Sequence, residues 1–188
     1  MANNKRMTHH SLSNTPFLCT SLFLVLMLFF LIPTANSYSS IPNSIFKTSQ
    51  DVIHYQRREG VLPAPSLGGN LMGCPSEQPY AVFLPPGYEN TTIEFPTVYF
   101  LHGFSTSVTS FRNTFLSLMY PEDMIIIVVN GKTPVGGSFY ENSEVTGNWE
   151  DYVVQAVVSF IDGQFRTIRN ASYRGISGLS MGGYSALN

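Results

Sequence analysis

The segment GLSMG, residues 178–182, places a serine between two glycines at the spacing G-x-S-x-G. The β-prone run YRGISG leads into the motif, and the helix-like run MGGYSALN follows the serine. A serine on a tight strand-to-helix turn needs small residues two positions before and after it, and its hydroxyl then stands above the edge of the sheet. We interpret Ser180 as a candidate catalytic nucleophile; the alternative is a plain glycine-rich turn.

A serine that attacks a carbonyl group also needs N–H donors that stabilise the negative charge developing on the oxygen. We expect two backbone amides to form this oxyanion hole, that of Met181 directly after the serine and that of Phe104 in a loop after an apolar run. His102 lies in the same loop. We favour a histidine that holds this loop by hydrogen bonds over a catalytic base, because the histidine typically follows this serine motif in the chain.

The segment SFYENSEVTGNWEDY, residues 138–152, supplies candidates for substrate binding. Loops at the carboxyl ends of parallel strands form the binding crevice of an α/β sheet, so we expect Phe139, Tyr140 and Asn142 to line it. Trp149 and Glu150 either shape the same pocket or brace the start of a helix. Nucleophilic catalysis by a serine requires neither a metal ion nor an organic cofactor, and we expect none.

Alternating strands and helices must position these residues. Apolar runs predict strands at 79–84, 96–101, 124–129 and 173–178. Apolar residues three and four positions apart predict one helix over 108–118, from Val108, Phe111, Phe115 and Leu118, and a longer one over 149–165 that Asn148 would cap. The order strand, helix, strand, helix, strand indicates parallel strands with right-handed crossovers, and so an α/β three-layer sandwich with a mostly parallel sheet.

Composition limits the classes of function. The chain has 188 residues, of which 44% are hydrophobic and 12% charged, which suits one globular domain. The net charge is −2 and no run of Lys or Arg is present, so a nucleic acid partner is not expected.

The first residues are typical of a secretory signal. Lys5 and Arg6 precede an apolar run over residues 16–32, and the small residues Ala35 and Ser37 suit a signal-peptidase site. We predict a signal peptide over 1–37 and a secreted protein; the alternative is an uncleaved membrane anchor over 16–32 with the body outside. Residues 38–78 read as an irregular leader with one short strand around Leu71.

Two further features concern the exported body. The triplets Asn90-Thr91-Thr92 and Asn170-Ala171-Ser172 have the form of N-glycosylation acceptors and are compatible with export. Cys74 is left without a second cysteine once the signal is removed, and it is either a buried thiol or paired with a cysteine outside this sequence.

Five segments in order resemble the putative esterase family of α/β-hydrolases: LPAPSLGGNLMG, YAVFLPPGYE, VYFLHGF, GGSFYENSEVTGNWEDYVVQAVVSFID and YRGISGLSMGGYSALN. The family includes feruloyl and acetyl xylan esterases, S-formylglutathione hydrolases and mycolyltransferases, and the resemblance spans about residues 60–188. It implies an α/β-hydrolase fold whose N-terminal part is residues 79–188. It also implies a serine hydrolase that cleaves small-molecule or glycan-linked carboxylic esters through an acyl-enzyme on Ser180.

In this family an acidic residue and then a histidine follow the serine. Residues 181–188 contain no Asp, Glu or His. We therefore expect both groups to lie beyond Asn188, and the 188-residue chain to be an inactive, poorly soluble fragment with an exposed strand edge. The alternatives are an acyltransferase of the same fold and a non-catalytic, truncated product that is secreted or tethered to a membrane.

Overall fold

The structure is a computed structural model that describes residues 55–111, 116, 120 and 123–188. The predicted signal peptide and the first part of the predicted leader lie outside these residues. The described elements, in order, are β1 (Gln56–Pro63), η2 (Pro65–Leu67), β2 (Glu77–Leu84), η3 (Tyr88–Asn90), β3 (Thr97–Leu101), η4 (Val108–Ser110), β4 (Ile125–Val129), β5 (Asn142–Ser143), β6 (Gly147–Asn148), α3 (Trp149–Asp151), η5 (Tyr152–Val157), α4 (Val158–Gln164), η6 (Ala171–Tyr173), β7 (Arg174–Gly178) and α5 (Met181–Ser185).

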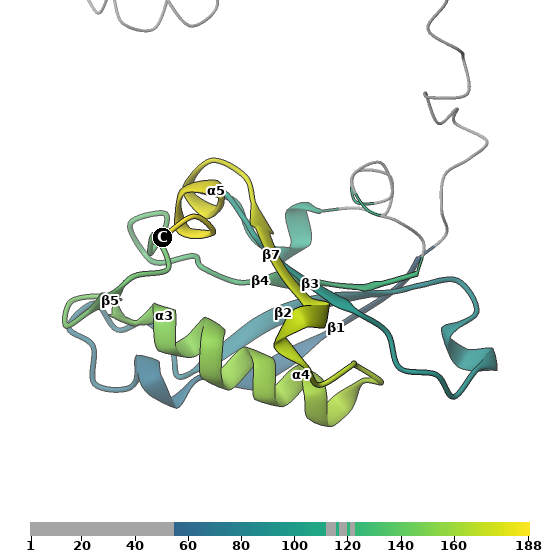
Figure 1. The fold of residues 1–188 in the computed structure, drawn as a ribbon. Coiled ribbons are helices and arrows are strands. Elements are labelled where there is room, and N and C mark those ends of the chain that lie inside the picture. The colour runs from purple at the N-terminus through teal and green to yellow at the C-terminus, as the bar shows by residue number, and fades with distance from the viewer. Residues whose placement is uncertain (1–54, 112–115, 117–119, 121–122) are drawn as a thin grey trace, which may run out of the picture. The chain divides into compact units, whose positions relative to one another are not determined.

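The main sheet has five strands in the order β1-β2-β4-β3-β7 (Figure 1). β3 is parallel to both β4 and β7, whereas β2 is antiparallel to both β1 and β4. Within this sheet, only β2 of the described strands therefore runs against the others, which confirms the predicted mostly parallel sheet. The carboxyl ends of β3, β4 and β7 meet at one edge, where α5 begins.

The central strand β4 explains why the sheet is covered on both faces. Every residue of Ile125–Val129 is buried. Successive side chains of a strand point to opposite faces, so an unbroken apolar run needs an apolar layer on each side. Two buried clusters meet this need: Ile125, Ile127 and Val129 belong to one, and Ile126 and Val128 belong to the other.

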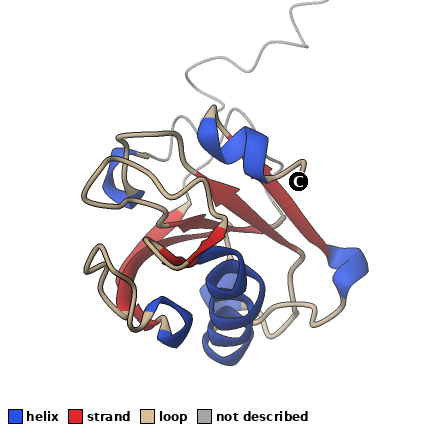
Figure 2. Ribbon diagram, turned by 90° about the vertical axis from the view of Figure 1, so that its left-hand side faces the viewer, coloured by secondary structure: helices blue, strands red, loops and turns tan. Residues whose placement is uncertain are grey.

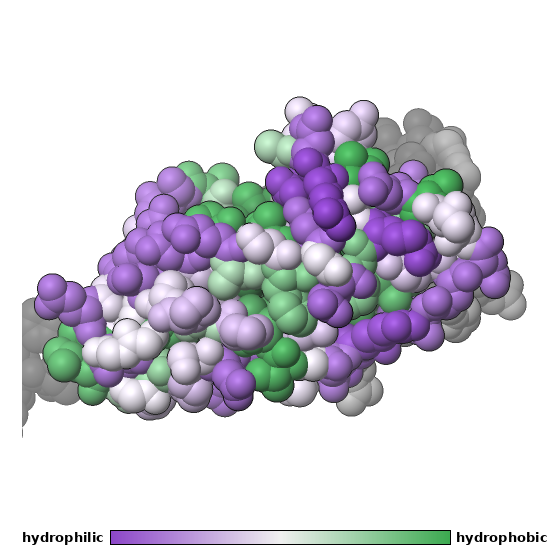
Figure 3. Space-filling view, turned by 90° about the horizontal axis from the view of Figure 1, so that it is seen from below, coloured by the Kyte–Doolittle hydropathy of each residue, from purple (hydrophilic) through white to green (hydrophobic). Residues whose placement is uncertain are grey.

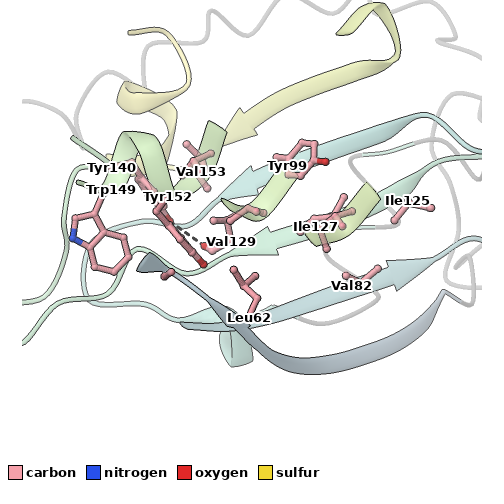
Figure 4. Close-up of a cluster of buried hydrophobic side chains, with 14 of the residues drawn as sticks. Leu62, Val82, Tyr99, Ile125, Ile127, Val129, Tyr140, Trp149, Tyr152 and Val153 are labelled. Carbon is pink, nitrogen blue, oxygen red and sulfur yellow. Dashed lines mark hydrogen bonds between the residues drawn. The ribbon is translucent and has the colours of Figure 1, made fainter. Parts of the chain in front are cut away.

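The helical segment from α3 through η5 to α4 covers the first of these faces (Figure 2). η5 is a π-helical stretch between two α-helical ones. The predicted apolar stripe faces the sheet, where Tyr152 and Val153 lie near Val129 and Trp149 lies beside Tyr152 in the same buried cluster (Figure 4). The helix predicted over 149–165 is confirmed.

The predicted cap of this helix is wrong. Asn148 occupies the position before the first helical residue, but its side chain accepts no capping hydrogen bond. Asn142 caps the helix instead, since its Oδ1 atom accepts hydrogen bonds from the backbone N–H groups of Glu150, at 3.0 Å, and Asp151, at 3.2 Å. A residue several positions upstream can do this because the hairpin of β5 and β6 folds back beside the helix start.

The second face of the sheet is covered by the segment after β3. Val108, Phe111 and Leu116 are buried there, with Phe83 and Phe100 from the sheet. Of the helix predicted over 108–118, the structure describes the short turn η4 and Leu116, which is helical, whereas Phe115 and Leu118 lie outside the described residues. Among the helices that the structure describes, none has the length and apolar character needed to cross a bilayer; the run over 16–32 lies outside the described residues.

The expectation of an irregular leader is wrong over Gln56–Pro63, which form β1, whereas residues 64–76 contain no strand, which agrees with an irregular leader. β1 pairs with β2 along its whole length, from Gln56 opposite Leu84 to Pro63 opposite Glu77, whereas Leu71 lies in an exposed turn. The sequence of β1, QRREGVLP, does not indicate a strand, because only Leu62 is buried and the other residues lie at a largely solvent-exposed edge of the sheet. Cys74, which follows this turn, is a buried free thiol whose pKa is raised by burial.

Candidate active site

Ser180 lies on the tight turn that the sequence predicts. β7 ends at Gly178 and α5 begins at Met181, so two residues connect strand and helix. Ser180 has φ 54° and ψ −114°, a left-handed backbone that residues other than glycine rarely adopt, and its residue surface is exposed. Such strain persists only where the surrounding structure enforces it, and it gathers at functional sites.

The glycines on either side of Ser180 are required by close backbone contacts. A Cβ atom on Gly178 would lie 2.3 Å from the carbonyl carbon of Gly182. A Cβ atom on Gly182 would lie 2.0 Å from the carbonyl oxygen of Leu101 at the end of β3. The G-x-S-x-G spacing predicts that these two positions have no room for a side chain, and this prediction is confirmed.

The loop after β3 meets the serine turn directly. A Cβ atom on Gly103 would lie 3.5 Å from the Cβ atom of Ser180, so the backbone of this loop passes next to the serine. Within the described part of the chain, the backbone N–H groups of Phe104 and Met181 donate no hydrogen bond to a protein acceptor. Unpaired N–H groups beside the serine are what an oxyanion hole needs, and their role stays a prediction.

His102 is buried and holds this loop. The N–H of Gly131 donates to its Nε2 atom at 2.9 Å, so we assign the proton to Nδ1, which donates to the carbonyl oxygen of Gly103 at 2.9 Å. Burial lowers the pKa of His102, which favours the neutral ring. Both nitrogens are engaged, so the interpretation of His102 as a loop-holding residue is confirmed. No other histidine lies in the described ranges, and none of these residues brings a free imidazole to Ser180.

Tyr140 joins the ends of two strands beneath the site. Its hydroxyl accepts a hydrogen bond from the N–H of His102 at 2.9 Å. It donates one to the carbonyl oxygen of Val129 at 3.2 Å (Figure 4). The residue is 5% exposed, and burial raises the pKa of its phenol well above the usual value. Tyr140 therefore acts in the fold as a brace between β3 and β4.

Phe139, by contrast, lies at the surface beside the serine turn. Its ring centroid is 6.3 Å from that of Phe104 and 6.1 Å from that of Tyr184, and all three side chains are about half exposed. The N–H of Phe139 points to the sulfur of Met181 at 3.4 Å, and its carbonyl oxygen accepts a hydrogen bond from Ser185 at 2.5 Å. The aromatic trio Phe104, Phe139 and Tyr184 is thus tied to α5.

The remaining candidate residues either brace the start of the helix or line a pocket. Asn142 caps the helix through Oδ1, and Trp149 is buried with its Nε1 donating to the carbonyl oxygen of Thr146 at 2.8 Å, so both brace the helix start. Glu150 is exposed and lines a pocket of about 250 Å³ together with Phe139 and Tyr140. Contact of Phe139, Tyr140 and Asn142 with a substrate stays a prediction.

A buried polar chain that the sequence did not predict lies beside His102, whose Nε2 atom is 3.4 Å from Oδ1 of Asn130. Asn130 donates from Nδ2 to Oε1 of Gln78 at 2.7 Å, and Gln78 donates from Nε2 to the carbonyl oxygen of Pro75 at 2.7 Å. Asn130 directly follows the apolar run of β4, and a polar residue at the end of a buried strand was the signal available. Among the described residues, no group of three or more His, Cys, Asp or Glu side chains could hold a metal ion.

The profile of the putative esterase family matches residues 72–188. The chain belongs to the putative esterase family. Two esterases from strains of Mycobacterium tuberculosis are 32% identical to this family member over an alignment of 114 residues, and the match covers 56% of this chain and 24% of theirs. The chain thus spans about a quarter of the length of these relatives.

Solved structures show the same fold. A ferulic acid esterase from Anaeromyces mucronatus is 20% identical with a TM-score of 0.56, over 75% of this chain and 54% of that one. A fluorophosphonate-binding serine hydrolase of Staphylococcus aureus is 24% identical with a TM-score of 0.54, over 69% and 49%. An S-formylglutathione hydrolase from Agrobacterium tumefaciens is 18% identical with a TM-score of 0.52, over 71% and 52%. This esterase-family chain has part of an α/β-hydrolase fold, as predicted.

Proposed function

We propose that Ser180 is the nucleophile of a carboxylic ester hydrolase that works through an acyl-enzyme. The observation that carries the proposal is the strained, exposed backbone of Ser180 between β7 and α5, held by contacts that leave Gly178 and Gly182 no side chain. Membership of the putative esterase family supports the same reaction class.

The proposed reaction has two steps. The Oγ atom of Ser180 attacks the ester carbonyl carbon, and the N–H groups of Phe104 and Met181 stabilise the negative oxygen. The bond between the carbonyl carbon and the alcohol oxygen then breaks, and the alcohol leaves with a proton. Water attacks the acyl-enzyme, restores the serine hydroxyl and releases the acid. An acyltransferase would differ only in using an alcohol in place of water.

The serine hydroxyl needs a general base to react at a useful rate. His102 has both nitrogens engaged, and residues 181–188 contain no Asp, Glu or His. We therefore propose that the 188-residue chain by itself is catalytically inert, and that Ser180 reacts only in a form of the protein that brings it an imidazole.

The substrate is proposed to be a small-molecule or glycan-linked ester. The half-exposed aromatic trio beside Ser180 offers apolar surface for an acyl group, and the pocket of about 250 Å³ that Phe139 also lines suits a group of modest size. The structural neighbour from Anaeromyces mucronatus is an esterase of an aromatic acid, solved with ferulic acid. We propose that the protein acts outside the cell, on the basis of residues 1–37, and that it meets a membrane only if residues 16–32 stay attached.

The test is labelling with a fluorophosphonate probe, which forms a covalent bond with activated serines. The 188-residue chain and any longer form that its gene encodes are compared, each with Ser180→Ala and with Ser185→Ala as a matched control. We expect labelling at Ser180 only in a form that carries a histidine after the serine, and hydrolysis of short-chain aryl esters by the same form.

Stoichiometric labelling of the 188-residue chain contradicts the proposed inertness. Labelling elsewhere, or equal labelling of Ser180→Ala, contradicts the proposed nucleophile. Added alcohols distinguish transfer from hydrolysis by the product.

A further inference from the structure

Two asparagines outside the site have free side-chain nitrogens at the surface. Asn90 ends the turn η3 and Asn170 precedes the turn η6, and both are exposed. The Oδ1 atom of Asn170 accepts a hydrogen bond from the N–H of Ser172 at 2.9 Å, which turns its Nδ2 atom away from the backbone. No described residue accepts a hydrogen bond from the Nδ2 atom of Asn90 or Asn170.

Other asparagines use the same atom inside the fold. Nδ2 of Asn70 donates to the carbonyl oxygens of Leu67, at 2.6 Å, and Cys74, at 2.8 Å. Nδ2 of Asn130 donates to Gln78. The two asparagines in N-x-[ST] triplets therefore differ from Asn70 and Asn130, whose Nδ2 atoms donate hydrogen bonds within the fold. A bulky group on Nδ2 of Asn90 or Asn170 would displace no such hydrogen bond.

The two triplets lie on adjoining segments at one end of the sheet. The N–H of Phe95 donates to the carbonyl oxygen of Arg166 at 2.9 Å, and the N–H of Ile168 donates to that of Phe95 at 2.9 Å. The guanidinium of Arg166 also lies 3.8 Å from the ring centroid of Tyr88, which is part of η3. The loop of Asn90 is thus held against the loop of Asn170.

The surface formed by the loops of Asn90 and Asn170 is remote from the candidate active site. Asn90 precedes β3 and Asn170 precedes β7, whereas Ser180 follows β7 at the opposite edge. The segments that lead into β3 and β7 approach the sheet from the side away from α5 (Figure 1). The five residues of β7 alone separate the two edges by about 16 Å at the usual rise of a strand.

An exposed apolar side chain follows each triplet. Ile93 comes directly after Thr92 and is 58% exposed, and Tyr173 comes directly after Ser172 and is 51% exposed. A glycan on the asparagine three residues earlier is bulky and solubilising and would cover such surface.

We propose that Asn90 and Asn170 are N-glycosylated, and that their glycans cover the amino-terminal edge of the sheet while leaving the Ser180 edge open. The donor is a lipid diphosphate oligosaccharide of the secretory pathway. The Nδ2 atom forms a bond to C1 of the first sugar, the bond between C1 and the diphosphate oxygen breaks, the amide loses one proton, and the lipid diphosphate leaves. The proposal rests on the export predicted from residues 1–37 and is independent of catalysis by Ser180.

The test is cell-free translation of the whole chain with endoplasmic reticulum microsomes. Transfer occurs as the chain enters the lumen, so the result does not require each variant to fold. We expect a protease-protected product with two glycans that an endoglycosidase removes. Asn90→Gln and Asn170→Gln each lose one glycan, and the double variant loses both. Thr92→Ala and Ser172→Ala each lose one although the asparagine is kept, whereas Ser172→Thr keeps it. Asn70→Gln and Ser180→Ala both keep two.

A replacement signal peptide ahead of residue 38 separates export from acceptor function. Glycans on this chain but not on the natural one overturn the predicted export, and with it the proposal for the natural protein. If the protease-protected chain lacks a glycan at Asn90, the proposal for Asn90 is overturned, and the same holds for Asn170.

Discussion

The carbonyl oxygen of Leu101 leaves no space for a side chain on Gly182, because a Cβ atom there would lie 2.0 Å away. Leu101 is the last residue of β3, and Gly182 is the second residue of α5. The first turn of the helix therefore packs directly on the end of a central strand. This contact fixes Ser180, one residue before the helix, above the edge of the sheet.

Gly182→Ala is expected to lower the free energy of unfolding by at least about 3 kcal/mol, the upper range for overpacking, since backbone rather than a movable side chain blocks the new methyl group. Gly163→Ala is the matched control, because no atom lies within 4 Å of a Cβ there and the residue is helical. We expect that control to raise stability by about 0.5 kcal/mol. Urea unfolding followed by circular dichroism measures both, and equal effects would contradict the argument.

The cap formed by Asn142 gives a second prediction. Asn142→Ala removes the acceptor for the N–H groups of Glu150 and Asp151, and we expect it to cost about 1 kcal/mol of unfolding free energy. Asn148→Ala is the control, since Asn148 occupies the cap position without a side-chain hydrogen bond. We expect the control to change stability by less than about 0.5 kcal/mol. A larger loss for Asn148→Ala in urea titrations would show that the capping residues are reversed.

Tyr140→Phe tests the brace between β3 and β4. The variant leaves the N–H of His102 and the carbonyl oxygen of Val129 without their partner in a buried place. We expect a loss of about 1–3 kcal/mol in unfolding free energy. Tyr184→Phe removes a hydroxyl from an exposed ring and serves as the control, with little change expected. Thermal and urea unfolding of the pair should agree, and similar stability of both variants would argue against the brace.

Stability should also depend on pH through His102. Burial lowers the folded-state pKa of His102 below its ordinary value of 6.5, so the unfolded chain takes up this proton more readily than the folded one. The contribution is fully present above pH 6.5 and falls as pH drops below that value. We expect the unfolding free energy to fall less steeply below pH 6.5 in His102→Gln than in the unchanged protein, although the variant starts lower. Parallel pH profiles would contradict a neutral His102.

Sequence patterns predicted the parts of the fold that local chemistry determines. The unbroken apolar run of β4 indicated a strand covered on both faces, and the stripe of Trp149, Tyr152 and Val153 indicated a helix against it. The glycine spacing around Ser180 indicated the strand-to-helix turn, because the steric need is confined to a few neighbouring residues.

Features that depend on distant segments were not predicted. β1 has a mostly polar sequence, and its pairing with β2 supplies what its own pattern lacks. Asn142 accepts a hydrogen bond from Glu150, eight residues onward, and so caps the helix, only because the hairpin of β5 and β6 brings it there. Tyr140 can brace β3 and β4 only because the two strands lie side by side in the fold, and no spacing in the local sequence indicates this.

The edge strand β7 gives the last prediction. β7 ends the described sheet order, and Ile176 on it is 48% exposed beside a hollow of about 230 Å³ that Val153, Val154 and Val158 also line. Hydrophobic residues also reach the surface on the face that carries α3 and α4 (Figure 3). An exposed apolar strand edge invites pairing between chains, and a lysine on the edge opposes it.

Ile176→Lys is therefore expected to raise the concentration at which the 188-residue chain begins to aggregate, as measured by static light scattering. Val61→Lys adds the same charge to β1 at the other described edge, where Val61 is 58% exposed. Because β1 already carries Arg57, Arg58 and Glu59, a further charge there should change aggregation less. An equal gain from both variants would mean that net charge, rather than the β7 edge, controls the association.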